Sequence, residues 1–170
     1  ITQDVSASGT VDALPSAATN TTSTSAVCEG TDVTLAGTGT PSITAGSGSI
    51  SGGDYVTGNI ASNETVTIRY TVAANGSCPQ TTSDASFTVN SAPSSATNTT
   101  STSAVCEGTD VTLAGTGTPS ITAGSGSISG GDYVTGNIAS NETVTIRYTV
   151  AANGSCPSTT SDASFTVNSA

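Results

Sequence analysis

The sequence contains very few of the side chains on which enzymes and nucleic-acid-binding proteins depend. Among 170 residues there is no His, Met or Trp, and the only positive side chains are two Arg. Ser and Thr therefore lack the His or Lys that usually activates them as nucleophiles. A net charge of -10 argues against nucleic acid and against anionic membrane surfaces, and the apolar runs are too short to span a bilayer. We expect no catalysis, no nucleic-acid binding and no membrane insertion.

Acidic side chains are the remaining candidates for chemistry. Asp54 and Glu64 stand on either side of Tyr55, and paired carboxylates can hydrolyse glycosides, but we interpret both as solvated surface acids. Calcium sites need closely spaced oxygen ligands. The acids of each copy are scattered, as the first copy shows: Glu29, Asp32, Asp54, Glu64 and Asp84. We therefore expect no metal and no cofactor.

The chain consists almost entirely of one segment written twice. When Pro15 is aligned with Pro93, residues 15–92 superimpose on residues 93–170, and only Ala17 against Ser95 and Gln80 against Ser158 differ. Repetition at a fixed period indicates an array of similar domains. We predict two repeats with these boundaries.

Residues 1–14 extend the same pattern backwards. "ASGTVD" at 7–12 aligns with "ASFTVN" at 85–90 when the alignment of the two copies is continued towards the start of the chain. We interpret residues 1–14 as the last strand of a preceding repeat, or as a strand donated to another molecule, and the chain as a segment of something longer.

Each repeat has the pattern of an all-β domain. In "ETVTIRYTVA" the apolar residues from Val66 to Val72 alternate with Thr and Arg69, as expected of a half-buried strand. Arg69 then faces outward, where we expect an ion pair with Asp84 or another acid. Gly, Asn and Asp interrupt the chain at short intervals, which is typical of turns. We predict two tandem Ig-like β-sandwich domains, with seven strands per repeat at 23–27, 31–36, 41–45, 48–51, 54–57, 64–73 and 84–90.

A repeat this small needs additional stabilisation, which disulfides can supply. Four cysteines allow three pairings. Pairing within each copy lets every repeat fold alone, so we expect Cys28 with Cys78 and Cys106 with Cys156. Two cysteines without His make zinc improbable. Disulfides indicate an oxidising, extracellular compartment.

Some short motifs resemble a known family. "VCEGTDVTLAGTG", followed by "ETVTIRYTVAANGSCPQTTSDASFTVN", is similar to the Ig-like or PKD-like repeats of very large Bacteroidetes surface proteins, including gliding-motility adhesins. The centre of the repeat, "TPSITAGSGSISGGDYVTGNIAS", departs from the aromatic-rich centre of that family. The resemblance implies secreted β-sandwiches in long arrays at the cell surface, and it implies no ligand.

Three functions fit these patterns. The first is a structural or adhesive module of an extracellular stalk, whose partners are the neighbouring repeats. The second is a homopolymeric filament subunit, in which residues 1–12 complete the sheet of another molecule by β-strand addition. The third is binding to surface polysaccharide, which needs exposed aromatic rings, and Tyr55 and Tyr133 are the candidates for it.

Overall fold

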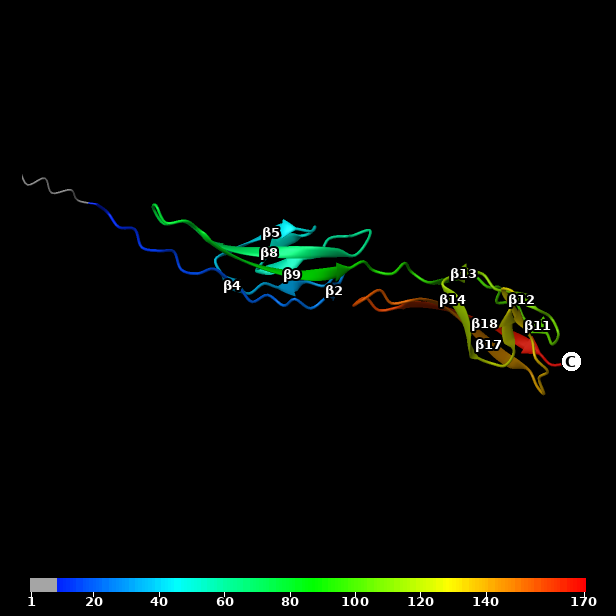
Figure 1. Ribbon diagram of the computed structural model, residues 1–170. Helices are drawn as coiled ribbons and strands as arrows, with labels where there is room; N and C mark the ends of the chain where they lie inside the picture. The colour runs from blue at the N-terminus through cyan, green and yellow to red at the C-terminus, as the bar shows by residue number, and fades with distance from the viewer. Residues whose placement is uncertain (1–8) are drawn as a thin grey trace, which may run out of the picture. The chain divides into compact units, whose positions relative to one another are not determined.

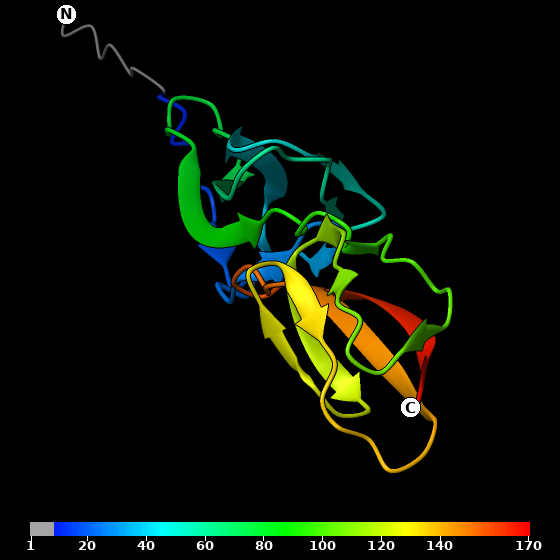
Figure 2. The same cartoon turned by 90° about the vertical axis from the view of Figure 1, so that its right-hand side faces the viewer.

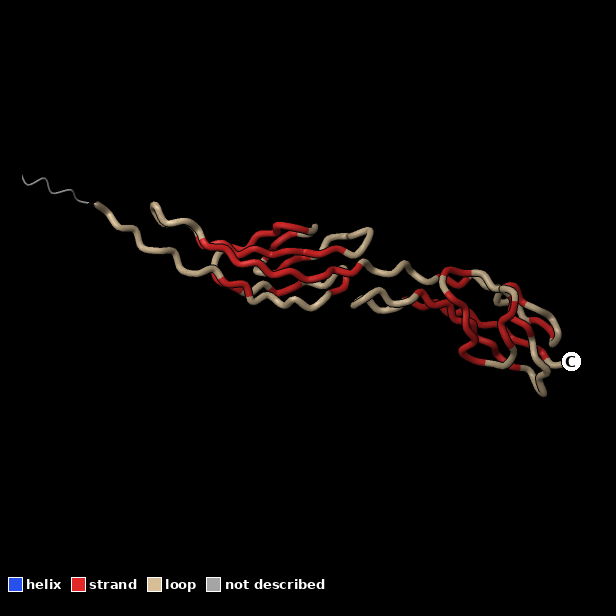
Figure 3. Tube along the Cα trace, in the orientation of Figure 1, coloured by secondary structure: helices blue, strands red, loops and turns tan. Residues whose placement is uncertain are grey.

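A computed structural model of the protein describes residues 9–170. This part of the chain is all-β, without a helix, and it divides between Ser91 and Ala92 into two compact units with the same order of strands (Figures 1 and 3). The predicted class, two tandem β-sandwich domains, is confirmed. Most of the strand predicted for residues 1–12 lies outside the described residues, and residues 9–12 belong to no strand.

Within the described residues, each unit holds nine strands. Those of unit 1 are β1 (Thr19–Asn20), β2 (Val27–Cys28), β3 (Val33–Thr34), β4 (Gly37–Thr38), β5 (Thr40–Ala45), β6 (Ser49–Ser51), β7 (Asp54–Val56), β8 (Glu64–Val72) and β9 (Thr81–Asn90). Those of unit 2 are β10 (Thr97–Asn98), β11 (Val105–Cys106), β12 (Val111–Thr112), β13 (Gly115–Thr116), β14 (Thr118–Ala123), β15 (Ser127–Ser129), β16 (Asp132–Val134), β17 (Glu142–Val150) and β18 (Thr159–Asn168).

Two sheets and one small strand pair make up unit 1. The larger sheet has the order β2-β9-β8-β5, the smaller one has the order β3-β7-β6, and β1 pairs with β4. All of these pairs are antiparallel except β2 with β9, in which Val27 lies opposite Val89 and Cys28 opposite Asn90. Unit 2 repeats this topology with β10 to β18. Figure 2 shows unit 2 with β17 in orange beside β18 in red, the two long strands of its larger sheet.

The long β8–β9 ladder forms where the sequence alternates most regularly. Thr, Val and Ile favour strands because their branched side chains fit a pleated surface. Val66, Ile68 and Tyr70 are buried, whereas Thr65 is exposed and Arg69 half-buried, as the alternation predicts. The two strands pair from Glu64 opposite Val89 to Val72 opposite Thr81.

The core lies between the two sheets. Val33 and Tyr55 come from the smaller sheet and pack against β8 and β9. The Tyr55 ring meets the edge of the Phe87 ring with 5.3 Å between centroids and 73° between planes, a favourable aromatic geometry. Unit 2 builds the same core from the equivalent residues.

The short strands depart most from the prediction. Residues 23–26 form no strand; the chain instead makes the two-residue strands β1 and β2 on either side of them. The pair β1–β4 passes so closely over Tyr70 that a side chain at Gly37 would collide with the Thr19 carbonyl and the Tyr70 ring. The strands predicted at 41–45, 48–51, 54–57 and 64–73 are found within one residue of those bounds.

Candidate interface at the two ends of each repeat

A tight turn closes the β8–β9 hairpin at one end of unit 1. Asn75 and Cys78 form both backbone hydrogen bonds of a bridge, at 3.1 and 2.9 Å, which leaves Gly76 and Ser77 at the tip. Gly76 has φ of 55°, a conformation that glycine adopts without strain. Asn-Gly is a typical turn sequence, and unit 2 repeats the turn at Asn153 and Cys156.

The tip of this hairpin holds the chain that leads into the unit. The Asp12 carboxylate accepts hydrogen bonds from the Ser77 backbone N–H at 2.8 Å and from the Ser77 hydroxyl at 3.1 Å. The Asn75 amide donates to the Ala13 carbonyl at 2.9 Å. The Cys78 thiol lies 3.6 Å from the Asp12 carbonyl oxygen. These contacts fix residues 12 and 13 on the turn.

A second anchor follows at the start of β9. The Thr81 hydroxyl donates to the Ser16 carbonyl at 2.8 Å and accepts from the Ala18 N–H at 2.9 Å. Unit 2 has the same anchor, in which Thr159 binds Ser94 and Ala96 at 2.8 and 2.9 Å. The incoming segment therefore docks on the hairpin end through a small set of polar contacts.

Electrostatics at the turn favour the charged form of Asp12. The hydrogen bonds from the Ser77 backbone and then from the Ser77 hydroxyl lower the pKa of the Asp12 carboxyl. Exposed apolar residues lie on both sides of Asp12 in the sequence: the side chain of Val11 is 94% exposed, and that of Leu14 is 83% exposed.

The outgoing strand leaves from the opposite end of the ladder. At the end of β9, the Asn90 carbonyl accepts a hydrogen bond from the Glu29 N–H at 2.9 Å, and the Ser91 N–H donates to the Asn63 side chain at 2.9 Å. Unit 2 repeats both contacts, from Glu107 to Asn168 and from Ser169 to Asn141, each at 2.9 Å.

The expected pairing of cysteines within each copy is wrong. Cys28 lies beside Asn90, at the last residue of β9, whereas Cys78 lies in the turn before Thr81, the first residue of that strand. Ten extended residues separate these ends by roughly 30 Å, and a disulfide needs Cα atoms within about 7 Å. The same distance separates Cys106, beside Asn168, from Cys156.

The oxidation states agree with this geometry. Cys28 and Cys156 are disulfide-bonded, whereas Cys78 and Cys106 are free thiols. The sequence alone could not separate the three pairings, because it does not show that the two cysteines of a copy lie at opposite ends of one ladder.

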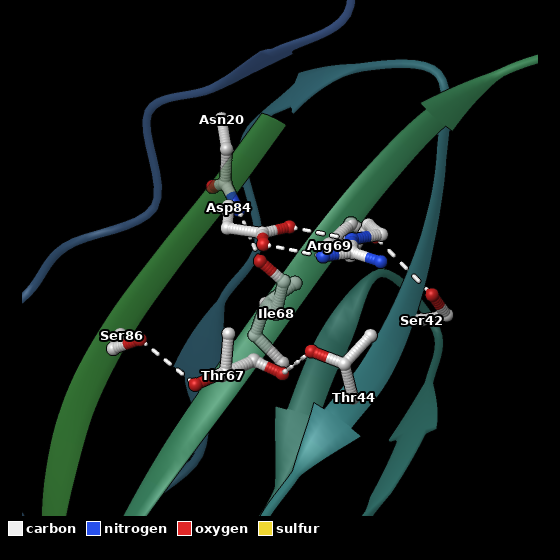
Figure 4. Close-up of polar contacts among 8 residues, drawn as sticks. All are labelled: Asn20, Ser42, Thr44, Thr67, Ile68, Arg69, Asp84 and Ser86. Atoms are coloured by element: carbon white, nitrogen blue, oxygen red, sulfur yellow. Dashed lines mark hydrogen bonds and ion pairs between the residues drawn. The ribbon is translucent and has the colours of Figure 1, made fainter. Parts of the chain in front are cut away.

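The outer face of the larger sheet carries a row of polar side chains (Figure 4). The Arg69 guanidinium binds the Asp84 carboxylate through two hydrogen bonds of 2.7 Å, which confirms the ion pair expected from the alternation. These bonds raise the pKa of Arg69 and lower that of Asp84. Beside them the Thr67 and Ser86 hydroxyls lie 2.8 Å apart.

The tyrosines expected to stack on sugars lie in the core. Tyr55 and Tyr133 are both 0% exposed, and each hydroxyl donates to a backbone carbonyl, that of Ser47 at 2.7 Å and of Ser125 at 2.8 Å. The other four aromatic side chains, Tyr70, Phe87, Tyr148 and Phe165, are also buried. All six aromatic side chains of the sequence are therefore buried, and the rings of Tyr55 and Tyr133 are not available to stack on sugars at the surface.

The acids considered for catalysis or calcium lie apart. Glu64 accepts hydrogen bonds from Ser47, and Glu29 accepts one from the Ile60 N–H. Within residues 9–170, no three acidic or cysteine side chains gather as a metal-binding group, and no pocket is present. No helix in this part of the chain is long and apolar enough to cross a membrane.

Comparison with known proteins does not assign the chain to a family. The chain matches no protein-family model. No curated protein sequence matches it either.

Proposed function

We propose that the chain is a structural repeat module of a long extracellular stalk or filament, in which each repeat adds length. The observation that carries this proposal is the placement of the two connections of unit 1. The incoming segment binds the hairpin at Asn75 to Cys78, and the outgoing chain leaves after Asn90, at the other end of β9. A domain connected at opposite ends lengthens an array with every copy.

The length that each repeat would add to an array follows from the length of its longest strand, which is β9 in unit 1. The ten residues of β9 correspond to roughly 30 Å at 3.3 Å per residue, and the turns at both ends extend the repeat to about 40 Å. Pro93, in the connection, fixes one backbone angle and limits its flexibility. Spacing therefore needs no ligand and no catalytic group.

Two further features support an extracellular setting. A chain with disulfide-bonded cysteines suits an oxidising compartment. The motifs "VCEG" and "NGSC", which resemble Bacteroidetes surface repeats, fall in the structure at the two ends of the ladder. We place the module at the cell surface, in arrays of the gliding-motility adhesin type.

Small-angle X-ray scattering on chains of different repeat number tests the proposal. A third copy of residues 15–92, inserted between Ala92 and Pro93, gives a matched three-repeat chain. We expect the maximum dimension to increase by about 40 Å per added repeat. An increase of only a few ångströms, as in a compact cluster of domains, would reject a spacing role.

A second candidate, β-strand addition, is favoured by the exposure of Val11. In the alignment of the repeats Val11 corresponds to Val89, which is 0% exposed in the core of unit 1, yet Val11 itself is 94% exposed. A core-type side chain without a core of its own fits a strand that completes the sheet of another molecule.

Two single substitutions distinguish this candidate from the first. Val11→Asp places a charge on the face that would be buried after strand addition, whereas Thr10→Asp places it on the opposite face and serves as the control. If strands are donated, concentration-dependent assembly seen by light scattering is lost in Val11→Asp and retained in Thr10→Asp. Equal behaviour of both variants and the wild type would exclude strand addition through this segment.

A further inference from the structure

The hairpin tip of unit 1 carries the sequence Asn75-Gly76-Ser77, which is open to solvent. All three residues are exposed, and within the described residues the Gly76 N–H has no hydrogen-bond partner. Gly76 has no side chain that could shield its neighbour. In the whole sequence only one other Asn is followed by Gly, and this is Asn153 in the equivalent turn of unit 2. An amide side chain thus lies next to an accessible backbone nitrogen.

This pair of residues can react without an enzyme. Asn is a thermolabile residue, and Asn-Gly pairs deamidate most readily because glycine lets its backbone nitrogen reach the preceding side chain. The Gly76 nitrogen gives its proton to hydroxide and attacks Cγ of Asn75. As this bond closes a succinimide ring, the bond from Cγ to Nδ2 breaks, and ammonia leaves with a proton from water. Water then opens the ring to Asp or isoaspartate, so the net reaction consumes water and releases ammonia.

The docked incoming segment restrains both reacting groups. The Asn75 side-chain nitrogen, which is the leaving group, donates to the Ala13 carbonyl at 2.9 Å. The Asp12 carboxylate lies so close to Gly76 that a Cβ on this residue would collide with it. Rotation of the Asn75 side chain onto the Gly76 nitrogen breaks the bond to Ala13, and the carboxylate disfavours the anion that forms on this nitrogen.

The product of the reaction cannot hold the segment in the same way. A carboxylate at position 75 only accepts hydrogen bonds, so it loses the bond to the Ala13 carbonyl, which is also an acceptor. It adds a negative charge beside Asp12, whose charged form is favoured because hydrogen bonds from Ser77 lower the pKa of its carboxyl. Undocking therefore exposes Asn75 to reaction, and the reaction opposes docking again.

We propose that Asn75 is a deamidation site, protected while residues 12 and 13 are docked on the turn and reactive when they leave it. Deamidation converts a reversible opening of the hairpin end into a permanent one. The proposal does not depend on the spacing role of the repeat, because it concerns contacts within unit 1 alone.

Deamidation rates of the full chain test the protection. Asp12→Ala removes the carboxylate that docks the segment, and Asp32→Ala, the matched control, removes the same charge from an exposed acid outside the turn. Each chain is kept in mildly alkaline buffer with reductant, digested briefly with trypsin and analysed by mass spectrometry with fragmentation. Asn75 lies in fragment 70–147, and Asn153, the internal reference, lies in fragment 148–170.

We expect Asp12→Ala to raise the rate at Asn75 about tenfold, the factor that corresponds to one hydrogen bond to a charged group. The rate at Asn153 should not change, and Asp32→Ala should leave both rates as in the wild type. Should Asp12→Ala disturb the fold as seen by circular dichroism, Asp12→Asn keeps the shape of the side chain and should accelerate the reaction at Asn75 in the same way.

Three results would overturn the protection. The first is an equal rate at Asn75 in all chains, and the second is equal acceleration in Asp12→Ala and Asp32→Ala. The third is a lack of deamidation at Asn75 even after Asp12 is replaced. None of these results bears on whether added repeats lengthen an array, so failure here is distinguishable from failure of the spacing role.

The effect of the product on docking is tested with Asn75→Asp, and Asn153→Asp is the matched control in unit 2. The Ser77 amide hydrogen is bound by Asp12 in the docked state. We expect its hydrogen exchange to become at least about ten times faster in Asn75→Asp and to stay unchanged in Asn153→Asp. The same exchange rate in both variants and the wild type would show that deamidation does not release the segment.

Discussion

The ladder body and the hairpin end of a repeat are stabilised in different ways. In the body, β8 and β9 pair over their whole length and bury Ile68 and Phe87 between the sheets. At the end, the incoming segment is held by a few polar contacts to Ser77, Asn75 and Thr81, near the surface. Regions with few buried contacts open at lower free energy than cores. We therefore expect the ladder body to be the more stable part of the repeat, and the docking of the incoming segment on the hairpin end to open more easily.

The largest effect is expected in the ladder body. Ile68→Ala removes a fully buried side chain and should lower the free energy of unfolding of unit 1 by about 3 kcal/mol, through lost burial and the cavity left behind. Urea denaturation in reductant, followed by circular dichroism, should change from one transition to two. Ile146→Ala is the matched control in unit 2. A single shifted transition would show that the units unfold together.

The next effect separates backbone strain from docking at the hairpin end. Gly76→Ala and Gly52→Ala both place a side chain at positive φ, 55° and 61°, at a cost of about 1 to 2 kcal/mol each. A Cβ at position 76 would also collide with the Asp12 carboxylate, whereas one at position 52 meets nothing. Hydrogen exchange of the Ser77 amide should accelerate in Gly76→Ala alone. Equal acceleration in both variants would argue against docking of Asp12 on the turn.

A smaller effect concerns the polar contact inside the core. Tyr55→Phe keeps the ring against Phe87 but removes the hydrogen bond to the Ser47 carbonyl, which should lower stability by about 1 kcal/mol. Burial, and then the charge of Glu64, raise the pKa of Tyr55. Its stabilising contribution is therefore complete below the usual tyrosine pKa of about 10 and is lost as the pH rises through the higher folded value. If alkaline denaturation is the same in Tyr55→Phe and the wild type, the tyrosine has no such role.

The smallest effect is the pH dependence of the hairpin end. The folded pKa of Asp12 is lowered by Ser77, so docking is fully stabilised above the usual aspartate pKa of about 4 and weakens as the pH falls through the lower folded value. The NMR shift of the Ser77 amide should follow this titration in the wild type and lose it in Asp12→Asn. A Ser77 shift that ignores pH in both proteins would mean that the carboxylate does not bind there.

The long strands could be predicted from the sequence, whereas the short strands and the contacts at the two ends of each repeat could not. The alternation from Val66 to Val72 determines which face of β8 is buried, because a strand has a period of two. Tyr55 was misplaced because a single aromatic in a short strand, "DYV", gives too little alternation to show which way its ring points. The short pair β1–β4 depends on contacts with Tyr70 that lie far away in the sequence.

The junction was missed for a different reason. The contacts of Asp12, Ser77 and Cys78 join residues that lie far apart in the sequence, and local patterns do not report such distances. A signal was nevertheless present. The alignment of the repeats places Asp12 on Asn90, and "NGSC" is a turn sequence that ends in a cysteine, so together they mark the end of the repeat that receives the incoming segment.

Single-molecule pulling on the ends of the full chain tests the central claim, that each tandem repeat is a separate spacer, most directly. In reductant we expect two unfolding steps, one for each repeat, each releasing on the order of 250 Å at about 3.4 Å per residue. A single step that releases the length of both repeats at once would contradict the account, because it would mean that the repeats do not unfold separately.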